Sequence, residues 1–237
     1  MIASRKTARI AGLLWLLMVP MGVFSLIYVP GKLIVRGNAS ETAGNILAHE
    51  WLFRIDIVVS LVSIVTWMFL ALVLYRLFKD VNQQLAALVV ILVLVQLPQS
   101  FVSQLLQLAA LELVRGADFL SVIAKPHRET LAMFCLHVNT LGIHLLEVFW
   151  GLWLFPVGLL VYRSRFLPRT IGIWLIINCF AYIVISLTSL LFPEHARTVT
   201  NIAYPALFGE LAIALWLFFV GVRPKPLPDL AQAPAGG

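Results

Sequence analysis

The sequence predicts an all-α polytopic membrane protein with six transmembrane helices and both termini in the cytoplasm. Hydrophobic residues make up 61% of its 237 residues and charged residues only 12%, with a mean hydropathy of +0.97. Soluble domains carry about 25% charged residues. Six apolar runs, each long enough to supply the ~20 residues that cross a bilayer, alternate with short polar segments. The bilayer is therefore the solvent in which this chain is expected to fold.

The six apolar runs set the limits of the predicted domain. They cover residues 8–29, 53–78, 84–111, 132–162, 170–192 and 202–222. The first run is too long for the core of a signal peptide, and no small-residue cleavage site follows it closely, so we expect it to remain as the first helix. Residues 1–222 then form one transmembrane domain, and the proline-rich segment 223–237 is expected to be a disordered cytoplasmic tail.

The segment between the first two helices is expected to contain a short helix of its own. Asn38 and Glu41 have the spacing of a helix-capping pair, and Ile46, Leu47 and Trp51 recur at helical spacing. This pattern predicts an amphipathic helix at the outer interface. An interfacial anchor and a lid over the bundle are its two alternative roles.

Basic residues predict the orientation. Ten of the seventeen Lys and Arg residues fall in the amino terminus, the second loop, the fourth loop and the carboxyl tail, and the other seven are mixed with acidic residues. Because cytoplasmic loops are enriched in Lys and Arg, both termini are expected inside. The net charge of +6 is thus mostly a topology signal. The lipid bilayer is the expected partner, and no basic stripe interleaved with aromatics indicates nucleic acid.

Polar side chains within the predicted spans are the candidates for function. Placing an ionisable residue within a span costs roughly 2.5–3.5 kcal/mol of insertion free energy, and such a residue usually faces the interior of the bundle. Counted along ideal helices, these residues concentrate in the outer half of the bundle. The candidate ligand-binding cluster comprises Arg54, Asp56, Gln96, Gln99, His144, Glu147 and Glu210.

Two polar stripes are expected to face each other. His137, Thr140, His144 and Glu147 share one face of the fourth helix, and a stripe of Gln and Ser follows the third. We hypothesise an outward-facing pocket for a small polar or amphiphilic ligand or partner. The alternative is structural, because such side chains join membrane helices at about 0.6 kcal/mol per interaction.

The charged members of the cluster also have structural interpretations. Arg54 and Asp56 are expected to form an interfacial ion pair. Glu210 is expected to be neutral or to pair with His144 or Arg54. Neither interpretation requires a ligand.

Two further function classes remain open. In a metal-dependent intramembrane hydrolase, His144 and Glu147 would be the first metal ligands, with His137 or Glu210 as the third. No His-Glu-x-x-His motif is present, and His137 lies about 10 Å along the helix from His144, so no metal is assigned.

In a proton-coupled transporter, Glu147 or Glu210 would be the group that gains and loses the proton. The third and fourth helices would be broken at Pro98 and Pro156. Few polar residues mark a route to the inner face, so binding ranks first. We expect no cofactor and favour a protein that is not an enzyme. The sequence identifies no catalytic residue and no oligomeric state.

Short motifs distributed over almost the whole chain resemble one family. They are Arg9-Ile10-Ala11-Gly12, Asn45-Ile46-Leu47, Leu52-Phe53-Arg54, Tyr75-Arg76-Leu77 with Val81-Asn82, Ser164-x-Phe166-Leu167-Pro168-Arg169-x-x-Gly172, Pro205-Ala206-x-x-Gly209-Glu210 and Leu215-Trp216-Leu217. Their order and spacing resemble the bacterial membrane family called domain of unknown function 4386. The resemblance implies a multi-pass protein of the bacterial inner membrane and brings no established activity. The fourth helix departs from the family pattern at His137, His144 and Glu147, so no family-wide catalytic role is implied for them.

Overall fold

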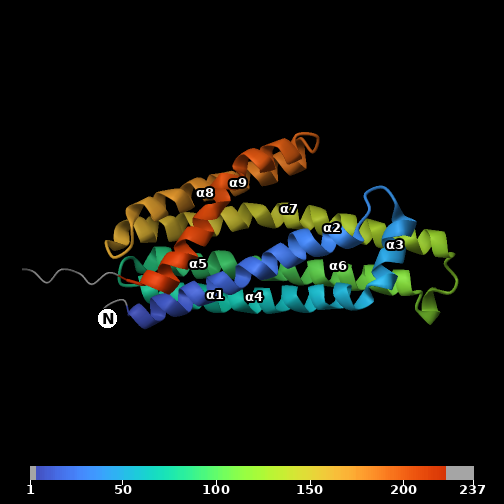
Figure 1. Cartoon of the computed structure of the whole chain (residues 1–237), viewed down its shortest axis with the longest axis horizontal. Coiled ribbons are helices and arrows are strands. Elements are labelled where there is room, and N and C mark those ends of the chain that lie inside the picture. Colours follow the sequence, from blue (N-terminus) through green and yellow to red (C-terminus); the bar gives the residue numbers. More distant parts are fainter. Residues whose placement is uncertain (1–3, 223–237) are drawn as a thin grey trace, which may run out of the picture.

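The computed structural model describes residues 4–222, and all regular elements in this range are helical (Figure 1). Six helices are long and apolar enough to cross a membrane, which confirms the all-α class and the six spans. The spans are α1 (Arg5–Val23) continued by the π-helix η1 (Phe24–Tyr28) and α2 (Val29–Leu33), α4 (Glu50–Phe78), α5 (Gln83–Leu94) with α6 (Leu97–Arg115), α7 (Lys125–Ser164), α8 (Arg169–Leu191), and α9 (Ala196–Leu215) with the π-helix η3 (Trp216–Val220). The predicted tail 223–237 lies outside the described residues.

The six spans form a closed ring. Going around it, α1 packs on α4, α4 on α5, α5 on α7, α7 on α8, and α8 on α9, which returns with η3 to α1. One end of the bundle holds Arg5, Val220 and the α4–α5 and α7–α8 turns, and we call it the termini end (Figure 1). The opposite end, which holds α2 and α3, is the distal end.

Two apolar clusters fill the bundle. The larger occupies the ring and includes Trp15, Trp67, Phe78, Trp153 and Leu217. The smaller lies at the distal end, and its members are Val29, Leu33, Ala43, Ile46, Phe53, Ile57, Ala110, Leu111, Val114, Ala132 and Leu136. Packed apolar side chains therefore fill the ring toward the termini end and the region beneath α3 at the distal end.

The predicted short helix between the first two spans is α3 (Ala39–Ala48). The Asn38 side chain accepts a hydrogen bond from the Glu41 backbone N–H at 3.0 Å and donates one to the Glu41 carboxylate at 2.9 Å, which confirms the capping pair. Its fully buried Ile46 faces the smaller cluster, and α3 packs on α6 and α7. The helix therefore covers the distal end of the bundle.

Two predicted spans differ in detail from the structure. The fourth helix, expected over 132–162, runs for 40 residues as α7, or about 60 Å, well beyond the 23-residue α8. Its Pro156 does not interrupt it, whereas the third span breaks into α5 and α6 just before Pro98. Because Pro98 has no backbone N–H, the series of hydrogen bonds between residues four apart is interrupted there. The Gln96 side chain compensates by donating to the Leu92 carbonyl at 2.6 Å.

Close backbone contact between α7 and α8 sets the register of the two helices. A Cβ at Gly158 would lie 2.8 Å from the Gly172 carbonyl oxygen, and one at Gly172 would lie 2.7 Å from that of Gly158. Small residues allow membrane helices to approach this closely. This contact holds the α7 residue Glu147 beside the α8 residue Tyr182.

Candidate functional site

The carboxylate of Glu210 lies in the middle of the bundle, where three helices meet. It accepts a hydrogen bond from the Tyr182 hydroxyl of α8 at 2.9 Å and a longer one from Trp15 Nε1 of α1 at 3.4 Å. The Asn178 side chain of α8 also lies near it, and its amide donates to the Leu207 carbonyl oxygen at 3.5 Å. Trp15 and Glu210 each lie about 15 Å along their spans from the termini end, half of the ~30 Å hydrocarbon core. An acidic group is thus enclosed at membrane depth by neutral donors.

Aromatic rings surround this carboxylate on several sides. Trp15 and Trp153 have ring centroids 5.1 Å apart, and Trp67 meets Trp153 edge-on at 5.5 Å. Trp150 meets Tyr182 edge-on at 6.0 Å. These distances are typical of favourable aromatic pairs. Trp15 and Tyr182, the two aromatic donors to Glu210, are therefore part of a larger aromatic wall.

A second carboxylate lies nearby on α7. The Glu147 side chain is 15% exposed, and its carboxylate lies 3.1 Å from His144 Nδ1. It also interacts electrostatically with Tyr182. The Ser186 hydroxyl of α8 donates to the His144 carbonyl, which fixes this turn of α7 against α8. We call Trp15, His144, Glu147, Asn178, Tyr182 and Glu210 the acid–aromatic site.

The acid–aromatic site has an unbalanced charge. Within residues 4–222, neither Glu147 nor Glu210 forms an ion pair with Lys or Arg. His144 is the nearest group that can become cationic. Among the described residues, His144 contacts Glu147, whereas Glu210 contacts neutral donors in a low-dielectric environment, where a missing charged partner is expensive.

Polar side chains of the third and fourth spans form a separate feature, the α6–α7 seam, defined by Gln96, Gln99, Ser103, Gln104 and Asn139. The Gln99 amide packs against Gly142 of α7, so the stripe does face α7 as expected. Oxygen atoms of Gln96, Ser103, Gln104 and Asn139 are buried without a hydrogen-bond partner.

The face of α7 that meets α6 is different from the one predicted. It carries Asn139 and Gly142, whereas His137 and Thr140 are exposed and the His144 side chain contacts Glu147 of its own helix. Four residues span slightly more than one turn of a helix. A small error in the predicted rotation of α7 about its axis therefore assigns the whole polar stripe to the wrong neighbouring helix.

The predicted ion pair between Arg54 and Asp56 is wrong. Arg54 Nε donates instead to Glu50 at 2.8 Å, while Asp56 is 3% exposed and hydrogen-bonds to Ser25 of η1. Residues two apart point to different sides of a helix, whereas residues four apart share a face. Glu210 likewise pairs with Tyr182 rather than with His144 or Arg54.

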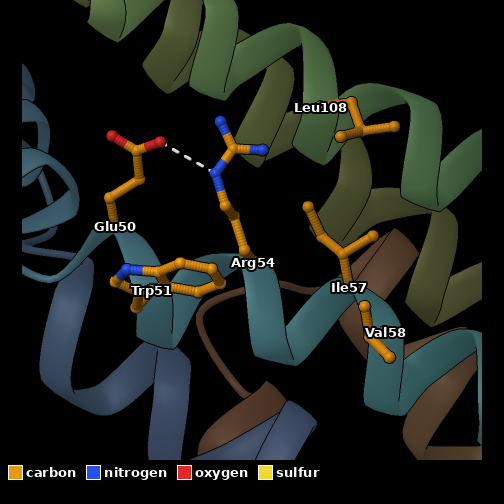
Figure 2. Close-up of a pocket in the computed structure, with 6 residues that line it drawn as sticks. All are labelled: Glu50, Trp51, Arg54, Ile57, Val58 and Leu108. Atoms are coloured by element: carbon orange, nitrogen blue, oxygen red, sulfur yellow. Dashed lines mark hydrogen bonds and ion pairs between the residues drawn. The ribbon is translucent and has the colours of Figure 1, made fainter.

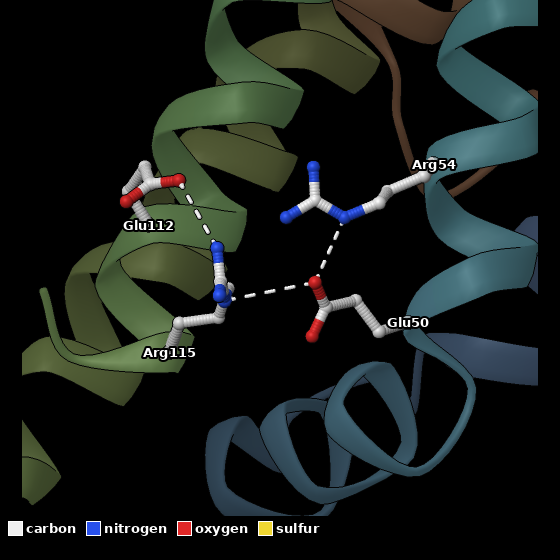
Figure 3. A network of polar contacts seen from close by, with 4 residues as sticks. All are labelled: Glu50, Arg54, Glu112 and Arg115. Carbon is white, nitrogen blue, oxygen red and sulfur yellow. Dashed lines mark hydrogen bonds and ion pairs between the residues drawn. The ribbon is translucent and has the colours of Figure 1, made fainter.

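Arg54 belongs to a charged group at the distal end that we call the distal network. Its members are Glu50, Arg54, Glu112 and Arg115 (Figure 3). It borders a groove of about 620 Å³ between α4 and α6, which the apolar side chains Trp51, Ile57, Val58 and Leu108 also line (Figure 2). The sequence-predicted cluster is therefore divided among the acid–aromatic site, the α6–α7 seam, Asp56 and the distal network.

Sequence reasoning missed Tyr182 and Trp15 as partners of Glu210. The available signal was that a Tyr hydroxyl or Trp N–H buried in a span usually finds an acceptor. For the metal hypothesis, no group of three or more His, Cys, Asp or Glu is placed to hold an ion in the part of the chain that the structure describes. His144 and Glu147 remain a pair of side chains from one helix.

Six apolar spans and ionisable groups enclosed between them define the class of this molecule as a polytopic helical membrane protein. The chain belongs to the family described as domain of unknown function DUF4386, whose model matches residues 10–221. An uncharacterized protein from Archaeoglobus fulgidus is 31% identical over 108 residues, which are 44% of this chain and 62% of that relative. The match thus spans under two thirds of the relative's length. No solved structure matches the chain.

Proposed function

We propose that this protein binds a small amphiphilic cation at the acid–aromatic site. The observation that carries the proposal is that Glu147 and Glu210 both interact with Tyr182 and have no Lys or Arg partner among the described residues. A positively charged ligand supplies the missing counter-charge. Three of its residues, His144, Glu147 and Glu210, belong to the cluster that the sequence predicts to bind a polar or amphiphilic ligand, and the lack of a Lys or Arg partner among the described residues favours a cation.

The aromatic wall supports an organic cation over a bare inorganic one. Trp15 and Tyr182 donate to Glu210, and they pack against the rings of Trp153 and Trp150, respectively. A cation over an aromatic face gains about 0.5–2 kcal/mol, and aromatic cages are the usual receptors for quaternary ammonium groups. The bond from Trp15 to Glu210 is long, at 3.4 Å, and is the contact that a ligand most easily replaces.

The packing around the site favours binding over transport or hydrolysis. Between Glu210 and the termini end, the ring is filled by apolar side chains such as Phe78, Val157, Leu160 and Leu217. Toward the distal end, His144 and Glu147 keep 28% and 15% of their side chains exposed. With the termini in the cytoplasm of a bacterial cell, as the basic residues and the family predict, a ligand reaches the site from outside.

Binding of benzyltrimethylammonium to the purified protein tests the proposal, with quenching of tryptophan fluorescence as the readout. Neopentylbenzene, which has the same shape without the charge, is the matched probe. Glu210→Gln keeps the volume and removes the charge, and Glu194→Gln in the exposed α8–α9 loop is the control variant.

We expect saturable binding of the ammonium compound that weakens at least about tenfold in Glu210→Gln, the effect of losing one charge-assisted contact. Glu194→Gln should bind as the wild type does. Equal binding of the neutral probe, or unchanged affinity in a folded Glu210→Gln protein, would contradict the proposal.

A further inference from the structure

The groove between α4 and α6 points to a second ligand of a different kind. It has a volume of about 620 Å³ and a mixed lining, with Glu50 and Arg54 among apolar side chains (Figure 2). Arg54 contacts neither Glu147 nor Glu210, and it is bonded to Glu50 of its own helix. We propose that this groove holds one phospholipid with a zwitterionic head group, its phosphate on Arg54 and its acyl chain along Ile57, Val58 and Leu108.

The depth of the groove matches the depth of a lipid. Counted from Phe78 along α4, Val58 lies about 30 Å from the termini end, Arg54 about 36 Å and Trp51 about 40 Å. The hydrocarbon core is about 30 Å thick and the bilayer with head groups about 40–45 Å. The apolar lining therefore lies at the edge of the hydrocarbon and the guanidinium in the head-group layer. Trp51, 78% exposed, has the position of an interfacial tryptophan.

The distal network leaves donors available for a phosphate. The carboxylate oxygen of Glu50 that accepts from Arg54 Nε at 2.8 Å also lies 3.6 Å from Arg115 Nε. The two terminal nitrogens of Arg54 point away from Glu50 into the space beside α6 (Figure 3). A guanidinium with both terminal nitrogens available is suited to a bidentate contact with phosphate oxygens.

The charge of the network selects the type of head group. Two arginines and two glutamates give a formal charge of zero, with opposite signs side by side. Glu112 is 3.9 Å from Arg115 and 47% exposed, so it remains open to a further cation. A phosphate and an ammonium within one head group match this alternation, whereas a purely anionic head group leaves Glu50 and Glu112 facing like charge.

Lipid titration followed by native mass spectrometry of the detergent-purified protein tests the proposal. The probes are phosphatidylethanolamine, phosphatidylglycerol of the same acyl chains, and glycerophosphoethanolamine, which is the head group without chains. Arg54→Gln removes the charge, and Val58→Trp fills the apolar part of the groove from a side chain that is 58% exposed. Arg36→Gln changes another exposed arginine of the distal end and is the matched control.

We expect one phosphatidylethanolamine to remain bound to the wild type and to Arg36→Gln, with affinity lowered about tenfold in Arg54→Gln. Val58→Trp should lower it as well, and glycerophosphoethanolamine should not bind. Equal or tighter binding of phosphatidylglycerol would overturn the head-group assignment. Unchanged lipid binding in both groove variants would overturn the site. Binding of benzyltrimethylammonium should be intact in either variant, which separates this proposal from the function proposed above.

Discussion

The contact between Gly158 of α7 and Gly172 of α8 gives the sharpest test of the packing that positions the acid–aromatic site. Replacing Gly158 by Ala places a Cβ 2.8 Å from the Gly172 carbonyl oxygen, where ordinary contacts begin at 3.4 Å. That oxygen belongs to the backbone and cannot rotate away, so the two helices must separate locally by roughly 0.6 Å. Adding a methyl group to a packed interior lowers the free energy of unfolding by about 1–3 kcal/mol.

A matched control isolates this effect from helix propensity. Alanine stabilises a helix interior by about 0.5–1 kcal/mol relative to glycine wherever there is room. Gly22 in α1 has no heavy atom within 4 Å of an added Cβ, so Gly22→Ala should be neutral or stabilising. Because both variants gain this helix propensity, it cancels in their comparison, and the difference in free energy of unfolding is expected to be about 1–3 kcal/mol in favour of Gly22→Ala.

Equilibrium unfolding in mixed micelles of mild detergent and dodecyl sulfate measures that difference. The separation should also move Glu147 away from Tyr182, so Gly158→Ala is expected to weaken binding of the ammonium probe while Gly22→Ala leaves it unchanged. If both variants unfold at the same dodecyl sulfate fraction, the close approach of α7 and α8 is refuted.

Three further outcomes are expected. Asn38→Ala removes the cap of α3 and should cost about 1 kcal/mol, seen as faster hydrogen exchange in α3 alone; unchanged exchange would contradict the capping role. Gly116→Ala should lower the free energy of unfolding by more than about 1 kcal/mol, because Gly116 has φ +71° and the Arg128 guanidinium occupies the place of its Cβ. Gly44→Ala, where the added Cβ meets open space, should not lower it, and equal melting temperatures of the two variants would contradict this. In a variant whose native cysteines are replaced, a cysteine at Gly37 should react with an impermeant maleimide in intact cells and one at Asn82 should not; the reverse result would invert the topology.

The spans and the α3 cap were predictable because each depends on residues close together in the chain. Hydropathy over about 20 residues identifies a span without knowledge of its neighbours. The Asn38–Glu41 pair is likewise a local signal. Span lengths were less predictable, since α7 continues beyond the bilayer by packing against α3 and α6, a contact between distant segments.

The partners of the polar residues were not predictable in the same way. Gln96 was expected in a ligand pocket, yet its amide compensates for the broken helix before Pro98. Asp56 was assigned to Arg54, yet the helix turns it toward Ser25 of η1. In both cases the sequence identified a polar residue within a span, and only the tertiary structure supplied its partner.

The sequence by itself determined the solvent of this protein, the number of its spans and the polar residues that they contain, because these properties follow from hydropathy and local spacing. Only the tertiary structure decided that Glu210 meets Tyr182 and Trp15, that Ser186 of α8 donates to the His144 carbonyl, and that Arg54 borders a groove. The reason is that the rotation of each helix about its axis is set by packing between helices. Close contacts such as that of Gly158 with Gly172 make this choice, and a rotation of one residue, about 100°, directs a side chain toward a different neighbour.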